Sequence, residues 1–228
     1  MIMPIIILTA IIGMIFQATF ITVEHGGKYV LADIFKGLAA FMFVIIGLLG
    51  YISVTNEPLG KKILIGLIFG MLGDIILNLR FIVKEELGQK VFLVGIVAFL
   101  VGHILYLAAL IPLTETLLMD IIIGAVLAAA LLAYIFKTMD VKLVFKIFGV
   151  VYLGAVIIMT VIAVHIAIVT GGSHDIVYAV GAVLFTASDI VLIFNTFSGV
   201  TKFSLRITNL SLYYIGQLLI AGSLFVLR

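Results

Sequence analysis

Eight runs of apolar residues, each about 20 residues long, follow one another along this chain of 228 residues, with only short polar breaks between them. A helix needs roughly 20 apolar residues to cross the hydrocarbon core of a bilayer. The chain is 65% hydrophobic and 11% charged, whereas soluble domains carry about 25% charged residues. We therefore predict an all-α, multi-pass integral membrane protein. Its spans are predicted at residues 3–24, 31–52, 61–82, 90–112, 117–136, 145–169, 175–197 and 204–226.

The short breaks predict how the spans are connected. Loops of this length join consecutive helices as antiparallel neighbours, so we expect an up-down bundle that forms a single transmembrane domain over residues 1–228. The N-terminal residues Met1 to Pro4 lack the basic segment and the cleavage site of a signal peptide, and we interpret them as the start of the first span. In a bacterial cell, such a protein would lie in the plasma (inner) membrane.

Lysine and arginine residues are distributed unequally between the two sides of the predicted bundle. Basic residues favour the cytoplasmic side of a membrane, so we expect both termini on the non-cytoplasmic side. Three basic residues lie on that side, Lys61, Lys62 and Arg228. Nine lie in the loops after spans 1, 3, 5 and 7: Lys28, Arg80, Lys84, Lys90, Lys137, Lys142, Lys146, Lys202 and Arg206. The formal net charge is only +2, and we expect no nucleic-acid partner.

Two aspartates, Asp74 and Asp189, lie inside the third and seventh apolar runs. A charge at bilayer depth is costly, so an acid kept there is by default a functional-site hypothesis. With a helical rise of 1.5 Å per residue, both acids should lie about 12 Å from the cytoplasmic boundary. The alternative is a structural role, in which a neighbouring hydroxyl or Lys36 satisfies each carboxylate.

The surroundings of the two acids suggest an internal repeat. Asp74 precedes His103 by 29 residues, and Asp189 precedes Gln217 by 28 residues. The dipeptide Phe35-Lys36 has a possible counterpart in residues 145–146. Spans 3 and 7 run in the same direction, so the repeat would be a parallel 4+4 arrangement. Chance similarity between apolar helices is the alternative.

Other polar residues are predicted to lie near the acids, in a pocket that opens toward the cytoplasmic leaflet. Asn78 follows Asp74 by one helical turn and shares its face, and Ser188 and Asn195 are candidates beside Asp189. Each candidate also has a purely structural interpretation. Lys36 can extend its ammonium group to the interface, and His103 can donate a hydrogen bond to a carbonyl group within the bundle. Tyrosines in these spans are also common helix-packing residues.

Several catalytic classes find no support in the sequence. The chain has no cysteine and only four histidines, which are scattered between loops and spans, so we expect no metal site. There is no Gly-x-Ser-x-Gly motif, phosphate loop or dinucleotide fingerprint, and we expect no cofactor. Two carboxylates in a pocket of low dielectric remain, and such a pair can divide the roles of acid and base.

Five segments follow one another in a recognisable order: FKG (residues 35–37), LGDIIL (72–77), AFLVGHILYLAAL (98–110), LFTASDIVL (184–192) and YYIGQLLIAGSL (213–224). Over roughly residues 30 to 226, this order resembles the YhhN/lysoplasmalogenase family. Gly37 is a departure, since the family usually has proline after the lysine. The departure affects how the helix begins and leaves the charge of the lysine unchanged.

The resemblance implies an eight-span enzyme that hydrolyses the vinyl ether of a lysoplasmalogen to a fatty aldehyde and a glycerophospho-alcohol. Its substrate would be a lysophospholipid from the bilayer, with no obligate protein partner. The two acids match the positions of candidate catalytic groups, one protonating the vinyl carbon and the other activating water, and Lys36 would suit the lipid phosphate. The matching polar positions are Lys36, Asp74, His103, Tyr106, Ser188, Asp189, Tyr213 and Gln217.

Two other functions use the same features. Intramembrane acids and parallel repeats also occur in proton-coupled transporters, although the three prolines, Pro4, Pro58 and Pro112, all lie at the ends of predicted spans. A receptor or assembly subunit without chemistry is a further alternative, and the two buried acids argue against it.

Overall fold

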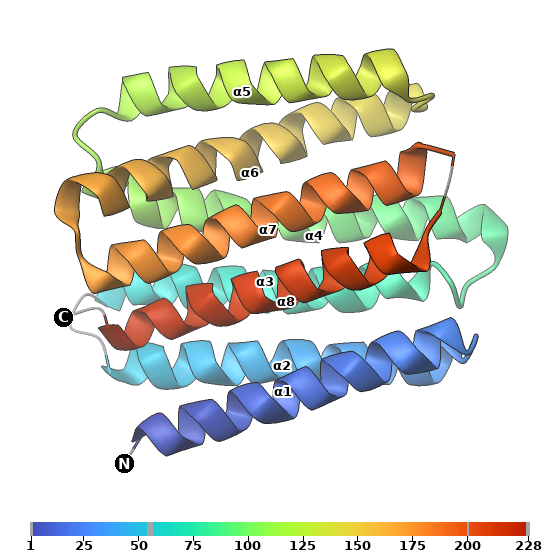
Figure 1. Ribbon diagram of the computed structural model, residues 1–228, viewed down its shortest axis with the longest axis horizontal. Coiled ribbons are helices and arrows are strands. Elements are labelled where there is room, and N and C mark those ends of the chain that lie inside the picture. The colour runs from blue at the N-terminus through green and yellow to red at the C-terminus, as the bar shows by residue number, and fades with distance from the viewer. Residues whose placement is uncertain (1, 54–56, 200, 227–228) are drawn as a thin grey trace.

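The computed structural model describes residues 2–53, 57–199 and 201–226, and these residues form helices joined by short turns (Figure 1). Eight helices in the described ranges are long and apolar enough to span a membrane, as predicted. The predicted break at Thr55 and Asn56, the residue Met1 and the basic residue Arg228 lie outside the described residues. The helices are α1 (Ile2–His25), α2 (Tyr29–Ser53), α3 (Glu57–Leu79), α4 (Glu85–Leu110), α5 (Leu117–Thr138), α6 (Leu143–Thr170), α7 (Ser173–Phe197) and α8 (Phe203–Ser223), with 3-10 turns η1 (Ile111–Leu113) and η2 (Leu224–Val226).

The predicted limits of the spans are wrong by several residues on both sides of the α3–α4 connection. The third span was predicted to reach residue 82, but α3 ends at Leu79, because the chain turns there and the amide of Phe81 bonds to the carbonyl oxygen of Asn78. The fourth was predicted to begin at residue 90, but α4 begins at Glu85. Acidic residues in a first turn interact favourably with the helix dipole, so these polar residues belong to the helix.

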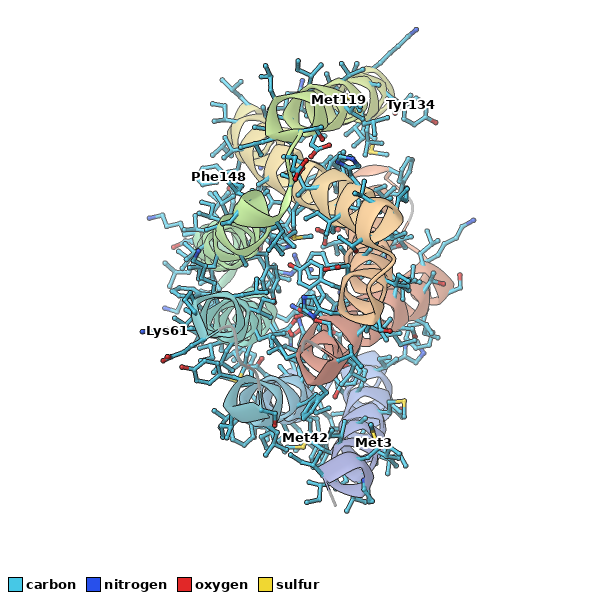
Figure 2. The ribbon with its side chains drawn as sticks, turned by 90° about the vertical axis from the view of Figure 1, so that its left-hand side faces the viewer. Met3, Met42, Lys61, Met119, Tyr134 and Phe148 are labelled. Carbon is cyan, nitrogen blue, oxygen red and sulfur yellow. The ribbon has the colours of Figure 1, made fainter. Side chains whose placement is uncertain are left out.

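The bundle has an elongated cross-section, with α1 and α5 at its two ends (Figure 2). Helix α2 packs between α1 and α3, and α6 packs between α5 and α7. The two halves of the chain meet where α2 packs against α8 and α4 packs against α6. Consecutive helices are neighbours, as predicted, except at one connection: α5 packs mainly on α6 rather than on α4.

Close backbone contacts between glycines hold two helix pairs together. A Cβ atom added at Gly102 on α4 would lie 3.0 Å from the carbonyl oxygen of Gly66 on α3. A Cβ atom at Gly216 on α8 would lie 2.8 Å from the carbonyl oxygen of Gly181 on α7. Small residues allow this approach between membrane helices. The packing brings the two helices that carry the acids against the helices that carry His103 and Gln217.

A third buried acid, Asp120, lies near the start of α5, at the end of the bundle away from Asp74 and Asp189. Its Oδ2 atom accepts a hydrogen bond of 2.7 Å from the Thr114 hydroxyl, and its Oδ1 atom lies 2.8 Å from Nδ1 of His165 on α6. This acid is not among the site residues predicted from the sequence. Its contacts join the α4–α5 connection to α6. Asp120 therefore has a structural role, which is the alternative to a functional role for a buried acid.

Candidate active site

Asp74 and Asp189 line the same cavity between the two halves of the bundle. Lys36, Ser188 and Tyr213, three other predicted site residues, also line it. All residues of the cavity wall come from the middle of the helices or from the end that carries the α1–α2, α3–α4, α5–α6 and α7–α8 connections. The cavity therefore occupies one half of the bundle along its axis, as the predicted depths of the two acids require.

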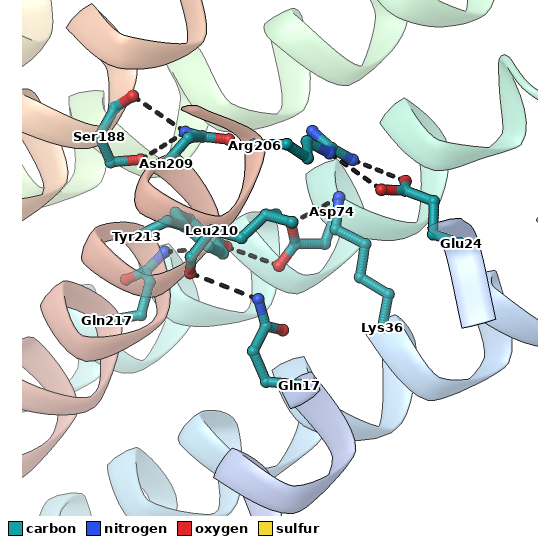
Figure 3. A network of polar contacts seen from close by, with 10 residues as sticks. All are labelled: Gln17, Glu24, Lys36, Asp74, Ser188, Arg206, Asn209, Leu210, Tyr213 and Gln217. Carbon is teal, nitrogen blue, oxygen red and sulfur yellow. Dashed lines mark hydrogen bonds and ion pairs between the residues drawn. The ribbon is translucent and has the colours of Figure 1, made fainter. Parts of the chain in front are cut away.

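Asp74 is held by a cation and a phenol, each from a different helix (Figure 3). Its Oδ1 atom lies 3.1 Å from Nζ of Lys36 on α2, and its Oδ2 atom accepts a hydrogen bond of 2.6 Å from the hydroxyl of Tyr213 on α8. Lys36 and Asp74 are both buried. Lys36 therefore does not extend to the interface: its ammonium group points inward and compensates the charge of the acid.

Tyr213 is in turn supported by two other predicted residues, Gln217 and Tyr106. The Gln217 amide group donates to the Tyr213 hydroxyl over 3.5 Å, and the Tyr106 hydroxyl donates to Oε1 of Gln217 over 3.2 Å. Neither Gln217 nor Tyr106 lines the cavity. These two side chains therefore orient the Tyr213 phenol from the side away from the cavity, and they do not present their own polar groups to the cavity.

Asp189 has a different partner. The hydroxyl of Tyr152 on α6 donates a hydrogen bond of 2.7 Å to its Oδ2 atom. Among the described residues, no lysine, arginine or histidine lies within ion-pairing distance of Asp189. Lys146, the possible counterpart of Lys36, instead lies over the ring of Phe136. Tyr152 was missed in the sequence analysis, although it precedes Asp189 by 37 residues, nearly the spacing between Lys36 and Asp74.

Ser188 precedes Asp189 on α7 and is fixed by a residue that the sequence analysis also missed. The amide nitrogen of the Asn209 side chain on α8 donates to Oγ of Ser188 over 2.8 Å and to its carbonyl oxygen over 2.9 Å. Both residues line the cavity. The asparagine side chain joins α7 to α8 one turn before Tyr213. In the sequence, the signal for Asn209 was a polar residue within an apolar span.

Besides Tyr106 and Gln217, three more predicted polar residues do not line the cavity: His103, Asn78 and Asn195. The His103 ring packs against Tyr152 and Phe185, and its Nδ1 atom lies 2.8 Å from the carbonyl oxygen of Phe99 on its own helix, which agrees with the packing interpretation. Asn78 is buried beside α2. Asn195 accepts a hydrogen bond from the amide of Lys202 and closes the α7–α8 connection.

A sequence model of the YhhN family matches residues 31–224. The chain belongs to the YhhN family. This family contains lysoplasmalogenases. The match includes every predicted site residue, from Lys36 to Gln217. Comparisons with curated proteins and with solved structures found no match.

The cavity of this YhhN protein changes character from one end to the other. Its charged end is formed by α2, α3 and α8, with Lys36 and Arg206 in the wall. Its apolar end reaches α5 and α6, where Leu132, Phe145 and Leu153 line it. Asp189 lies on α7, which packs between α6 and α8. Throughout residues 2–53, 57–199 and 201–226, no three His, Asp or Glu side chains are grouped as metal ligands.

Two carboxylates with unlike partners can serve two chemical roles in one cavity. The ammonium group of Lys36 neutralises an ionised Asp74, while Asp189 has a neutral phenol as its partner. The arrangement is suited to donating a proton at one position and accepting one at another. A structural role for each acid is also compatible with these contacts, and activity measurements separate the two interpretations.

Proposed function

We propose that this YhhN protein hydrolyses the vinyl ether bond of a lysoplasmalogen, or of a related ether lysolipid, to a fatty aldehyde and a glycerophospho-alcohol. The observation that carries the proposal is that Asp74 and Asp189 line one cavity, with cations at one end and apolar side chains at the other. A lysolipid has the same order of groups: a charged headgroup, the bond to be cleaved and a hydrocarbon chain. Membership of a family that contains lysoplasmalogenases supports the choice of reaction.

In the proposed mechanism, Asp189 is the proton donor. Its Oδ2 atom accepts the Tyr152 hydrogen bond, which leaves Oδ1 to carry the proton. Transfer of this proton to the vinyl carbon one bond from the ether-bearing carbon produces an oxocarbenium ion. Glycoside hydrolysis passes through a similar cation between two carboxyl groups.

Asp74 acts as the base in the second step. Its carboxylate accepts a proton from a water molecule while the oxygen of that water bonds to the oxocarbenium carbon, giving a hemiacetal. The Lys36 ammonium group and the Tyr213 hydroxyl hold the carboxylate in place. The hemiacetal then collapses: Asp74 returns its proton to the departing alcohol oxygen, the carbon–oxygen bond breaks, and Asp189 accepts the hydroxyl proton of the hemiacetal. The aldehyde is released, and both acids are restored to their starting states.

The proposed enzyme has both termini on the non-cytoplasmic side, in the plasma (inner) membrane of a bacterial cell, and its two halves are a parallel repeat. Two features support the repeat. Helix α2 packs on α8 as α6 packs on α4. In addition, each acid follows, by eight residues, a glycine that contacts a glycine of the next helix, Gly66 before Asp74 and Gly181 before Asp189.

The proposal is tested with purified protein and 1-alkenyl-glycerophosphocholine, by measuring aldehyde release. Asp74→Asn and Asp189→Asn should each lower kcat by at least about a hundredfold, since general acid–base groups contribute about 10²–10⁴. Asp140→Asn is the matched control, because Asp140 is an exposed acid between α5 and α6. Release at the native rate by either site variant would refute the mechanism.

A proton-coupled transporter is the second candidate, and the buried Lys36–Asp74 pair favours it, because intramembrane ion pairs also occur in proton relays. Against it, the eight described spans are continuous helices, whereas transporter sites are typically built from broken ones. Reconstitution in liposomes distinguishes the two functions. Aldehyde release without proton or solute flux supports the hydrolase, and flux without turnover supports the transporter.

A further inference from the structure

A group of charged side chains lies at the charged end of the cavity, where the α1–α2, α3–α4 and α7–α8 connections meet. Arg206, in the first turn of α8, lines the cavity and makes a two-point ion pair with Glu24 on α1 (Figure 3). Its Nη2 atom lies 2.7 Å from Oε1, and its Nε atom lies 3.0 Å from Oε2. The same guanidinium group lies 6.0 Å from the centroid of the Phe20 ring, and the Lys36 ammonium group lies 5.6 Å from that centroid.

A second guanidinium group, that of Arg80, has no ionic partner among the described residues. Arg80 follows the last residue of α3, and its side chain lies 4.6 Å from both the Phe81 and the Phe92 ring centres. Its Nε atom is buried without a hydrogen-bond partner, and within the described ranges no carboxylate lies within ion-pairing distance. Phe92 forms part of the cavity wall. Burial, with a smaller contribution from the charge of Arg206, lowers the pKa of Arg80 to about 10, so the group is cationic at neutral pH.

Two of these three cations are already in ion pairs: Lys36 with Asp74 and Arg206 with Glu24. Within the described ranges, Arg80 is in no ion pair, and neither is Asp33, a half-buried acid on α2 near Lys36. A buried polar group without a partner is unfavourable, so a ligand oxygen at the Arg80 guanidinium group would be stabilising. Arg80 does not itself line the cavity, but it packs on Phe92, which does. A guanidinium group matches phosphate oxygens, because its donors form a planar fork.

We propose that Arg80 and Arg206 bind the phosphodiester group of a lysophospholipid whose hydrocarbon chain enters the cavity. The Phe81 and Phe92 rings hold the Arg80 guanidinium plane, and Glu24 orients that of Arg206. This assignment replaces the expectation that Lys36 contacts the phosphate, because the Lys36 ammonium group is paired with Asp74. The identity of the lipid rests on the proposed function, whereas phosphate recognition by the two arginines does not.

The test measures binding without turnover. Native protein and variants in detergent are titrated with 1-O-hexadecyl-glycerophosphocholine, a saturated ether that has no vinyl bond to cleave, and with 1-O-hexadecylglycerol, which lacks the phosphate. Dissociation constants come from the ligand-dependent rise in unfolding temperature. Arg80→Gln and Arg206→Gln should each weaken binding of the phospholipid about tenfold, and neither should alter binding of the alkylglycerol. Arg80→Lys, which retains the charge without the planar fork, should give an intermediate loss.

The matched control is Lys90→Gln, which removes one positive charge from an exposed position on α4 at the same end of the bundle. It should leave both dissociation constants unchanged. The proposal is overturned if Arg80→Gln binds the phospholipid as native protein does, or if Lys90→Gln loses as much affinity. Should Arg80→Gln fail to fold, Arg80→Lys and Arg206→Gln decide the question by the same criterion.

Inorganic phosphate distinguishes a lipid site from a site for a soluble anion. Stabilisation by millimolar phosphate alone, equal to that given by the lysophospholipid and lost in Arg80→Gln, would overturn the lipid assignment. The ligand is a saturated ether and is not hydrolysed, so binding and turnover are measured separately. If the protein binds this ligand through the arginines but releases no aldehyde from the vinyl ether substrate, the proposed reaction is refuted and the phosphate site is retained.

Discussion

The Tyr152 hydroxyl lies 2.7 Å from Oδ2 of Asp189. This contact joins α6 to α7 in the second half of the bundle, as the Lys36–Asp74 pair joins α2 to α3 in the first. Both acids therefore accept a hydrogen bond from a phenol, but only Asp74 also has a cation as its partner. This difference is the basis for assigning unlike roles to the two acids.

Tyr152→Phe should lower kcat about tenfold, since it removes one donor from the proposed acid while keeping the ring that packs against His103. The measurement is the steady-state rate of aldehyde release. Tyr134→Phe, at an exposed tyrosine on α5, serves as the control and should have no effect. An unchanged rate in Tyr152→Phe would show that the phenol has no role in the reaction.

Lys36→Met should destabilise the protein by about 3 kcal/mol, because removing one member of a buried ion pair leaves the other charge uncompensated. Asp74→Asn should also destabilise. The double variant should lose less unfolding free energy than the sum of the two single losses. Each single variant leaves one member of the pair buried without its partner, and the double variant contains neither member. Unfolding in detergent followed by circular dichroism measures all four proteins, and strictly additive losses would contradict a direct interaction.

Gly149→Phe should narrow the apolar end of the cavity. Gly149 lines the cavity, and a Cβ atom there would meet no other atom within 4 Å, so a large ring has room to enter. We expect kcat/KM to fall about tenfold for long-chain substrates and to remain unchanged for short-chain ones. Gly154→Phe is matched to it: Gly154 lies on the same helix with the same free space, but it does not line the cavity. Equal effects of the two variants would exclude this path for the hydrocarbon chain.

Gly216→Ala should destabilise the bundle by about 2 kcal/mol, because the new Cβ atom would lie 2.8 Å from the carbonyl oxygen of Gly181 and would force α7 and α8 apart. Gly222→Ala, on the same helix, meets no atom within 4 Å and should be neutral or slightly stabilising. Apparent unfolding temperatures in detergent provide the comparison. A neutral Gly216→Ala would mean that the two helices can separate without cost.

Single cysteines should reveal the orientation, since the native chain has none. Cysteine at position 84, between α3 and α4, should react with a membrane-impermeant maleimide only after the cells are permeabilised. Cysteine at position 61, at the opposite end of α3, should react in intact cells. The reverse pattern would place both termini in the cytoplasm.

Much of the architecture was predictable, because a membrane span is determined by local composition. The eight spans and the two acids follow from the lengths of apolar runs and from the anomaly of a charge within them. Tyr152 and Asn209 were not predictable in the same way. A single tyrosine or asparagine in a span is ordinary, and its role depends on which helix faces it.

Arg80 and the position of α5 show the same limit. From the sequence, Arg80 is one of nine loop cations, because nothing local indicates that its side chain packs against two phenylalanine rings. Helix α5 was expected beside α4, since short loops favour adjacent neighbours. The tertiary packing instead places α6 against α4, an arrangement that depends on the whole bundle.

The restriction of the cavity to one half of the bundle determines which lipids the protein can reach. Its walls come from the middle of the helices and from the end that carries Arg80 and Arg206. A lysolipid would enter from the leaflet at that end, and the same chemical species in the opposite leaflet would persist until it crossed the bilayer. The protein would thus create a difference in lipid composition between the two leaflets, and its rate in a cell would depend on whatever transfers lysolipids across the membrane.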